Sequence, residues 1–452
     1  MKYVTHFISF HFISFPQRNI VLIKIVIVFY IMFLCLLRVS IFMIICLIVF
    51  RICPSYPNIH IVPTSVSDDD LHSVASFRSM RRFPSVVWRS QKNGAVIVRC
   101  SQPELGWLGW RNTEDENLLS AIPLACSQDP GTENKPESGQ TTPDQNGNMK
   151  QILFFSTISK DSVEPGTHSI PLVIFLLVLG TMLLNKRSWL SSLENTKWLH
   201  YIGAILRAAN LVVSAVDQEA RPVLVHCSDG WDRTPQIVAL AQLLLDPYYR
   251  KIEGFQVLVE REWFEFGHKF ADRCGHSLDS EDGNERSPVF LQWLDCVYQV
   301  YKQFPCAFEF NEAYLVKLVH HTYSRLFGNF LFNTNRERVK ENLSKRTTSV
   351  LCCVDFNPIP LSLSLPHPPL PTLPYLVFTF ICYLIIYLQI LYPDFSMNNL
   401  SLWRSVYLSN SSLSTNTTED ISNPLETGEI TPDIESMCLQ KTRSCENLAK
   451  LQ

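Results

Sequence analysis

The chain has 452 residues, of which 46% are hydrophobic and only 18% are charged, whereas charged residues make up about 25% of an average protein. This composition excludes a disordered, collagen-like or strongly charged protein. The formal net charge of -3 gives no basic field for nucleic acid, so any anion-binding surface must be local. The 14 Cys lack the paired C-x2-C spacing of zinc sites, so we expect reduced, mostly buried thiols, no metal and no cofactor.

Three apolar blocks occur along the chain, at 20–50, 170–184 and 370–391. A helix needs about 20 apolar residues to cross a membrane, so the first and third blocks are long enough and the second is too short. The sequence between the blocks is typical of a soluble protein. It includes a polar stretch at 127–150 that resembles a linker, and a helical pattern with regularly spaced aromatic residues over 188–350. The tail after 409 is rich in Ser, Thr and Asn, and we expect it to be disordered.

The chemistry is concentrated at residues 221–236, RPVLVHCSDGWDRTPQ. Pro222 to His226 is apolar and β-branched, which predicts a short buried strand. A loop follows, and then Thr234 is expected to cap a helix that begins at Pro235 and continues through IVALAQLLL. The sequence therefore predicts a strand, a loop that starts with a cysteine, and a helix whose N-terminus faces that loop.

Cys227 and Arg233 form the C-x5-R spacing within this loop. A helix N-terminus presents free N–H groups and the positive end of its dipole, so the loop is suited to bind an anion. The same field favours the thiolate form of Cys227, which is the nucleophilic form. The guanidinium of Arg233 can offer two donors to phosphate oxygens. A bare C-x5-R match occurs often by chance, but the strand before it and the helix after it favour a phosphatase nucleophile.

Two carboxylates in the same loop, Asp229 and Asp232, are candidates for the proton donor to the leaving oxygen. Two acids beside a phosphate would repel it unless one is protonated or turned away, so at least one is expected to act in catalysis. We favour Asp232, which lies next to Arg233, as the general acid. Asp229 is the second candidate, with an orienting role as the alternative.

The motif HCSDGWDRT, together with GFQVLVEREWFEFGHKFADRCGH, SPVFLQWLDCVYQ and FPCAFEFNE further along, resembles the myotubularin-related phosphoinositide phosphatases, and most closely their FYVE-containing subgroup. Similar blocks lie at 76–117, 188–217 and 398–408. The resemblance implies an α/β fold of the Cys-based phosphatase type, with a central, mostly parallel sheet, helices on both faces and the Cys loop at the carboxyl end of a strand. It implies hydrolysis of the 3-phosphate of phosphatidylinositol 3-phosphate and phosphatidylinositol 3,5-bisphosphate through a phosphocysteine intermediate.

Residue by residue, the resemblance makes Cys227 the nucleophile, Asp232 the acid and Ser228 to Arg233 the phosphate cradle. This cradle includes Asp229, Gly230 and Trp231, although Trp231 could equally serve in packing.

A second basic cluster of the family matches Lys269 and Arg273, whose spacing of four predicts that both lie on one helical face. We expect His226 to shape the loop. His268 and His276 are expected to be structural.

The sequence departs from the family pattern in several segments. We assign 1–64 to an apolar segment outside the family, 65–125 to the start of the phosphatase domain, 126–187 to a linker and apolar insert, 188–357 to the catalytic core, 358–390 to a Pro/Leu-rich apolar insert, 391–409 to the end of the domain and 410–452 to the tail. Part of the pocket wall is not found in 126–187, so the domain is expected to be incomplete.

The apolar blocks have two interpretations. If they were membrane spans, pieces of one domain would lie on opposite sides of the bilayer. We therefore favour translated non-coding sequence from an imperfect gene model, with a membrane anchor in the first block as a variant.

Three functions stay open: a lipid phosphatase, a catalytically impaired scaffold for active relatives, and a protein-tyrosine or dual-specificity phosphatase. A multi-span membrane protein is the further structural alternative. The resemblance implies a cytoplasmic enzyme, peripheral on endosomal membranes, whose partners are phosphoinositide lipids and copies of itself or of its relatives. Nucleic acid is not expected as a partner.

Overall fold

The computed structural model of the chain describes residues 42–46, 52–106, 109–128, 151–156, 196–276, 285–350 and 389–408. Contacts divide the chain into two units, Met1–Leu408 and Ser409–Gln452, and every described residue lies in the first. The predicted disordered tail, the second apolar block and most of the other two blocks lie outside the described residues.

The domain is built around a four-stranded sheet with the order β3-β4-β6-β5. β4 (Val96–Cys100) and β5 (Leu153–Ser156) run parallel to β6 (Val223–His226), whereas β3 (Ser85–Arg89) is antiparallel to β4. The sheet is therefore mixed, with two parallel pairings and one antiparallel pairing. β5 lies inside the segment 126–187, which we assigned to a linker and apolar insert. Its four residues are not part of a linker but form the strand next to β6 at the edge of the sheet.

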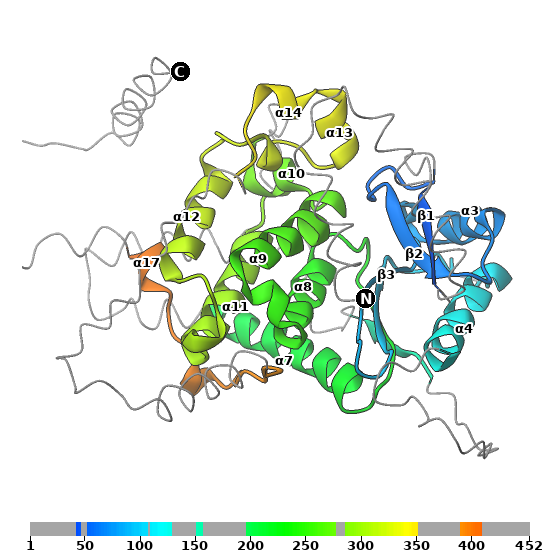
Figure 1. Ribbon diagram of the computed structural model, residues 1–452. Helices are drawn as coiled ribbons and strands as arrows, with labels where there is room; N and C mark the ends of the chain where they lie inside the picture. The colour runs from blue at the N-terminus through cyan, green and yellow to red at the C-terminus, as the bar shows by residue number, and fades with distance from the viewer. Residues whose placement is uncertain are drawn as a thin grey trace, which may run out of the picture. The chain divides into compact units, whose positions relative to one another are not determined.

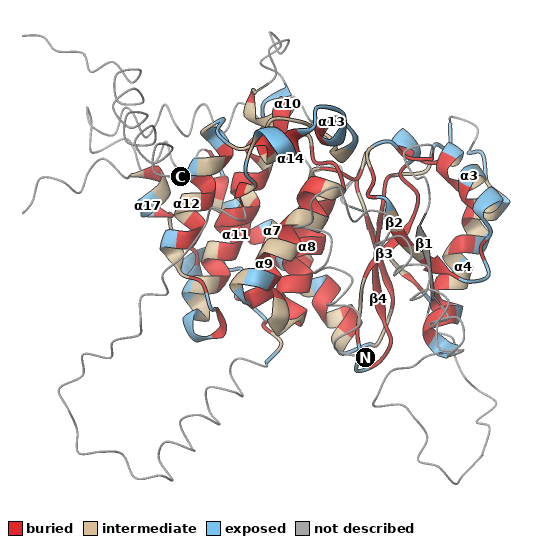
Figure 2. Cartoon of the chain, turned by 45° about the horizontal axis from the view of Figure 1, so that its top comes forward, coloured by how far each residue is buried: buried red, intermediate tan, exposed pale blue. Residues whose placement is uncertain are grey.

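Helices cover both faces of this sheet, as predicted, and Figure 1 shows the strands between the α3–α4 side and the α7–α8 side. α4 (Thr113–Gln128) packs against one face, where Ile122 and Ala125 join Val98 and Leu224 in a buried cluster. α7 (Trp198–Asp217) and α8 (Arg233–Leu245) pack against the other face. α8 is mostly apolar and is buried from Thr234 to Leu245 (Figure 2), so it is covered on every side.

The N-terminal part begins with two antiparallel strands, β1 (Phe42–Cys46) and β2 (Ile59–Pro63). β1 belongs to the first apolar block, so this end of the block is a strand and not part of a membrane-spanning helix. Tyr56 is fully buried in the main core and its hydroxyl donates to the Phe83 carbonyl at 2.9 Å. The packed domain therefore begins before residue 65, where the sequence analysis placed its start. α3 (Asp68–Phe77) follows, with a capping box formed by its N-cap Ser67.

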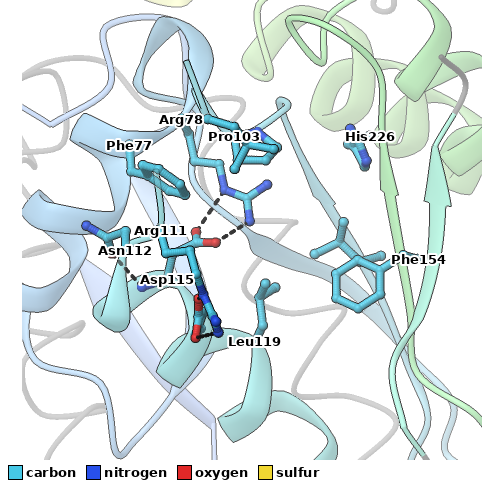
Figure 3. A pocket seen from close by; sticks show the side chains of 12 residues that line it. Phe77, Arg78, Pro103, Arg111, Asn112, Asp115, Leu119, Phe154 and His226 are labelled. Carbon is cyan, nitrogen blue, oxygen red and sulfur yellow. Dashed lines mark hydrogen bonds and ion pairs between the residues drawn. The ribbon is translucent and has the colours of Figure 1, made fainter. Parts of the chain in front are cut away.

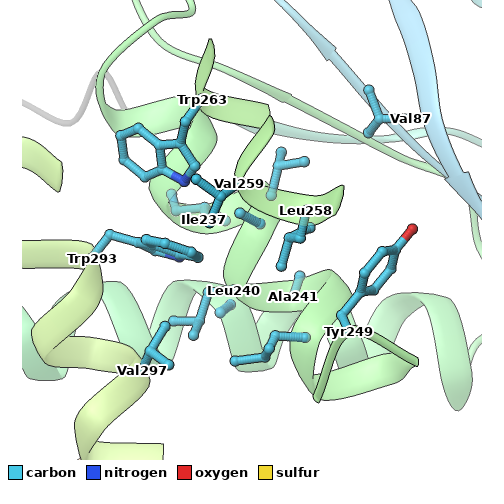
Figure 4. Close-up of a cluster of buried hydrophobic side chains, with 14 of the residues drawn as sticks. Val87, Ile237, Leu240, Ala241, Tyr249, Leu258, Val259, Trp263, Trp293 and Val297 are labelled. Atoms are coloured by element: carbon cyan, nitrogen blue, oxygen red, sulfur yellow. The ribbon is translucent and has the colours of Figure 1, made fainter. Parts of the chain in front are cut away.

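The remainder of the domain is helical and surrounds a second part of the same core. In Figure 4, Trp263 and Trp293 lie over Leu240 of α8 and Val259. The longer elements are α9 (Ile252–Val259), a π-helical turn (Glu260–Glu265), α10 (Phe270–Cys274), α11 (Val289–Gln303), α12 (Glu312–Tyr323), α13 (Asn335–Lys340), α14 (Leu343–Arg346) and α17 (Arg404–Tyr407). Short 3-10 helices occur at Ser79–Arg81, Pro247–Arg250, Pro305–Ala307, Gly328–Phe330 and Met397–Asn399.

One described helix, α7, has the length and composition of a membrane span, with a mean hydropathy of 1.5 over its most apolar window. In this fold α7 packs against α8 and α11 and buries Leu206 and Val213. A core helix of this kind passes the same test of length and composition.

A buried carboxylate joins the C-terminal block to the core. Asp295 of α11 is fully buried and accepts hydrogen bonds from Trp198 Nε1 at 2.8 Å, Tyr407 Oη at 2.9 Å and Gln299 Nε2 at 2.9 Å. Burial raises the pKa of Asp295, although these three donors oppose the rise. The carboxylate therefore connects α7, α11 and α17, which are far apart in sequence.

We expect Asp295→Ala to lower the free energy of unfolding by about 3 kcal/mol, because buried donors would lose their acceptor. Asp295→Asn, which keeps the volume and one acceptor oxygen, is the matched control and should cost less than half of that. Chemical denaturation of the two variants measures the difference. Equal losses for both variants would mean that the hydrogen bonds of Asp295 contribute little.

Candidate active site

The sequence RPVLVHCSDGWDRTPQ folds as a strand, a loop and a helix. β6 ends at His226, the Cys loop (residues 227–232) follows, and α8 begins at Arg233. The Cys227 thiol is buried, with 2% of the residue exposed, and its Sγ accepts the N–H of Gly230 at 3.1 Å. His226 Nδ1 lies 3.1 Å from the Cys227 carbonyl, which is the contact with the loop that we expected of it. The loop thus holds a sulfur atom at the N-terminus of a buried helix.

Gly230 is required at its position by the backbone. Its φ is +80°, and a Cβ built there would lie 2.5 Å from the carbonyl oxygen of Cys100. An L-residue would be strained by the dihedral angle and would also collide with β4. The tight approach of the loop to β4 therefore depends on glycine.

α8 begins two residues earlier than we predicted. Asp232 occupies the N-cap and Arg233 is the first helical residue, whereas Thr234 was expected at the cap. Thr234 is fully buried, and its hydroxyl has no hydrogen-bond partner among the described residues. Arg233 Nη2 lies 3.4 Å from Ser228 Oγ. Its guanidinium is therefore directed toward the Cys loop, where we predicted that it binds phosphate.

Asp232, the residue that we favoured as general acid, forms an ion pair with Arg273 and contacts His268. Its Oδ2 lies 2.8 Å from Arg273 Nη2, and its Oδ1 lies 3.1 Å from His268 Nδ1. Burial would raise the pKa of Asp232, but the hydrogen bond from His268 and the charge of Arg273 outweigh it and hold the pKa well below its ordinary value. In this arrangement Asp232 is therefore an ionised carboxylate.

His268 was expected to be structural, and the structure places it against the Cys loop instead. It is 1% exposed, and its Nδ1 lies 2.8 Å from the carbonyl of Trp231 as well as 3.1 Å from Asp232. Both of these neighbours are acceptors, so Nδ1 carries the proton. No local pattern predicts this contact, because His268 and Asp232 are brought together by the tertiary fold.

Lys269 and Arg273 both reach the Cys loop. α10 begins at Phe270, so Lys269 is its N-cap, and the N–H of Arg273 donates to the Lys269 carbonyl at 2.8 Å. Lys269 Nζ lies 4.6 Å from the centre of the Trp231 ring, a cation–π contact. Arg273 pairs with Asp232 and also with Glu285.

The other loop residues are held by the segments that precede and follow β3 and β4. Ser79 Oγ donates to Asp229 Oδ1 at 2.9 Å, and the N–H of Gln102 donates to the Ser228 carbonyl at 2.9 Å. Asp229 is therefore turned toward Ser79.

Two buried arginines beneath the loop were missed by the sequence analysis. Arg82 and Arg99 both donate to the carbonyl of Gly230, at 3.0 Å and 2.8 Å. A signal exists in the sequence, because Arg99 lies inside the apolar strand VIVRC, where an unpaired charge is unfavourable. It does not reveal the partner, which is 131 residues away.

A cavity of about 190 Å³ lies on the face of the sheet that α4 covers (Figure 3). Its lining includes His226 and the ion pair of Arg78 with Asp115, at 2.6 Å, together with Phe154 of β5. None of the predicted catalytic or substrate-binding residues lines it, so it is not the predicted substrate site. Among the described residues, no group of three or more His, Cys, Asp or Glu is arranged to hold a metal ion.

The chain matches known proteins over most of this domain. The family model of the myotubularin-like phosphatase domain matches residues 48–339. Phosphatidylinositol-3,5-bisphosphate 3-phosphatase MTMR4 of Mus musculus is 48% identical over 348 residues, which cover 67% of this chain and 29% of the mouse protein. The protein of the same name from Xenopus laevis is 46% identical over 351 residues, covering 67% of this chain and 32% of its own length.

Myotubularin of Rattus norvegicus is 40% identical over 320 residues, which cover 68% of this chain and 52% of the rat protein. The chain thus spans about a third of the length of the MTMR4 proteins and about half of myotubularin. The matched family model covers more than half of the chain, including the Cys loop and the helices that pack around it. The chain belongs to the family of myotubularin-like phosphatases.

Proposed function

We propose that the chain is a phosphoinositide 3-phosphatase that acts on phosphatidylinositol 3-phosphate and phosphatidylinositol 3,5-bisphosphate. The observation that carries the proposal is the position of Cys227 at the N-terminus of α8, with the Gly230 N–H at 3.1 Å and the side chain of Arg233 directed toward the loop. The MTMR4 relatives are named as 3-phosphatases of the bisphosphate, which supports this substrate class.

In the first step, the Cys227 thiolate attacks the phosphorus of the 3-phosphate, and the bond from phosphorus to the inositol oxygen breaks. Arg233 and the N–H groups of the Cys loop hold the non-bridging oxygens and stabilise the charge that develops on them. The product of this step is a phosphocysteine and an inositol oxygen that needs a proton.

Asp232 supplies that proton in our proposal, with Asp229 as the second candidate. Asp232 is ion-paired with Arg273 in the free protein, so it must gain a proton when the substrate draws Arg273 away. Water then attacks the phosphocysteine, the bond from phosphorus to sulfur breaks, and inorganic phosphate leaves. The same carboxylate accepts the proton of that water.

The second basic cluster supports a substrate with more than one anionic group. Lys269 lies over Trp231, and Arg273 lies beside Asp232, so both cations border the phosphate site. We assign them to the remaining phosphates of the headgroup, with Ser228 to Trp231 around the 3-phosphate. The enzyme would act peripherally on endosomal membranes from the cytoplasm, alone or assembled with copies of itself or of relatives.

A catalytically impaired scaffold is the second candidate. One observation favours it: the proposed acid is held as a carboxylate by Arg273 and His268. A scaffold of this kind would bind an active relative and the lipid without turnover. A protein-tyrosine phosphatase is a weaker alternative, because Lys269 and Arg273 would then have no phosphate to bind.

The test is phosphate release by the full chain from vesicles that contain phosphatidylinositol 3-phosphate, the 3,5-bisphosphate or phosphatidylinositol 4-phosphate, with a phosphotyrosine peptide as a fourth substrate. We expect release from the first two substrates and none from the others. Release from the peptide alone would assign a tyrosine phosphatase. Binding to the vesicles without release from any substrate would favour the scaffold.

A further inference from the structure

The carbonyl oxygen of Gly230 is held from below by two guanidinium groups, those of Arg82 and Arg99. We propose that these two arginines position the Cys loop for anion binding, and that Arg82 supplies a fixed positive charge beneath the bound anion. The inference rests on the proposed assignment of Cys227 as the nucleophile. It adds two positioning residues that do not themselves touch the substrate.

Arg82 is fully buried, and its hydrogen-bond partners are neutral. Its Nη2 donates to the carbonyls of Gly230 at 3.0 Å and Phe266 at 2.9 Å, and its Nη1 donates to Ser55 Oγ at 2.8 Å. The guanidinium also lies 4.5 Å from the centre of the Tyr56 ring. None of these partners is a carboxylate, so the charge of Arg82 is not neutralised by its contacts among the described residues.

Arg99 is bound differently. Its Nη2 donates to the Gly230 carbonyl at 2.8 Å, while its Nη1 lies 2.8 Å from Glu262 Oε2 and 2.9 Å from the Glu262 carbonyl. Glu262 also pairs with Arg261. Arg99 therefore has a buried carboxylate partner, which it shares with Arg261 and which Arg82 lacks. We expect its contribution to the loop to be mainly geometric.

Fixing the Gly230 carbonyl also fixes the N–H of Trp231, which belongs to the same peptide. A trans peptide is planar, so the C=O of Gly230 and the N–H of Trp231 point in opposite directions. With the carbonyl held toward the two arginines, the N–H of Trp231 points away from them, to the other side of the loop. The N–H of Gly230, in the preceding peptide, donates to Cys227 Sγ at 3.1 Å. The arginines therefore fix the direction of the Trp231 donor within the Cys loop.

The charge of Arg82 has a second consequence. A buried cation without an anionic partner is costly, and a bound anion lowers that cost. The Cys loop that would hold a phosphate is linked to Arg82 through the Gly230 carbonyl. Arg82 therefore favours the occupied loop, in addition to Arg233.

The test measures the reactivity of Cys227 without a lipid. The rate of iodoacetamide alkylation of Cys227 is measured at one pH, without and with orthovanadate, a phosphate analogue that shields the thiol. In Arg82→Met the other charged groups around the thiol are unchanged: Asp229, Asp232 and Arg233 in the loop and α8, Lys269 and Arg273 from the segment that includes α10, Arg99 from β4 and His226 from β6.

We expect Arg82→Met to weaken vanadate protection of Cys227 about tenfold, because the fixed positive charge beneath the loop is lost. Arg99→Lys, which keeps a charge beside Glu262 but loses the fork of donors, should weaken protection by a smaller factor. Arg250→Met is the matched control. Arg250 is also fully buried and donates to a carbonyl, that of Gln389 at 2.9 Å, but this contact is remote from the loop.

Unchanged vanadate protection in a folded Arg82→Met protein would overturn the proposal, and so would an equal loss of protection in Arg250→Met. If Arg82→Met does not fold, Arg82→Lys decides: weakened vanadate protection supports the proposal, and unchanged protection overturns it. Because alkylation and vanadate binding need no lipid, a chain that releases no phosphate from lipid can still pass or fail this test.

Discussion

Cys227→Ser is expected to abolish phosphate release from phosphatidylinositol 3-phosphate, with a rate at least about 10³-fold below that of the unchanged chain. A serine hydroxyl is far less acidic than a thiol, so the loop cannot hold it in the ionised, nucleophilic form. The substitution is nearly isosteric at a buried position, and the Gly230 N–H can donate to the serine oxygen. We therefore expect the stability of the domain to change little, and vesicle binding to persist.

The matched control is Cys306→Ser, which changes the exposed thiol of the Pro305–Ala307 turn and should keep full activity. The measurement is phosphate release under single-turnover conditions, together with thermal unfolding of each variant. A Cys227→Ser protein that releases phosphate at an undiminished rate would show that another group is the nucleophile. Loss of activity in both variants would point to general damage by cysteine replacement.

The local part of the site was predictable from the sequence because its signals are local. An apolar β-branched run predicts the strand that ends at His226, and the apolar run after Arg233 predicts a buried helix. Cys227, Arg233 and the two carboxylates all lie within seven residues of one another. Helices on both faces of the sheet are what an α/β arrangement of apolar strands and helical segments requires.

The tertiary part of the site was not predictable in the same way. His268 contacts Asp232, which is 36 residues away in the sequence, and Arg82 contacts Gly230, which is 148 residues away. The sequence around His268 or Arg82 has no pattern that predicts these partners. The helix cap is Asp232 rather than Thr234, although Asp232 makes no side-chain capping hydrogen bond. β5 was missed because four residues beside a polar stretch give too short a pattern, and only pairing with β6 identifies them as a strand.

The ion pair between Asp232 and Arg273 links these two parts of the site, and it makes the identity of the general acid testable. His268 and Arg273 hold the pKa of Asp232 below its ordinary value, against the effect of burial. A carboxylate with a lowered pKa is protonated only at acidic pH, so it cannot donate a proton near neutral pH unless its cationic partner moves. A phosphate of the substrate that attracts Arg273 would raise the pKa of Asp232 and prepare it to donate.

We expect Asp232→Asn to lower kcat for phosphatidylinositol 3-phosphate by about 10²-fold to 10³-fold, because the inositol oxygen is a poor leaving group without a proton. With p-nitrophenyl phosphate, whose leaving group needs no proton, the loss should be less than about tenfold. Asp229→Asn is the matched control in the same loop, and it should affect the two substrates equally. The ratio of the two kcat values in each variant is the quantity to measure.

Arg273→Gln tests the same ion pair from the other side. Removal of the positive charge raises the pKa of Asp232, so its protonated form persists to higher pH. The pH above which kcat/KM declines, which reports the free enzyme, should therefore move upward, although kcat/KM itself falls because a substrate contact is lost. Two results together would make Asp229 the general acid: an unchanged pH of this decline in Arg273→Gln, and a leaving-group dependence in Asp229→Asn rather than in Asp232→Asn. Asp232 would then serve to hold Arg273 at the edge of the Cys loop.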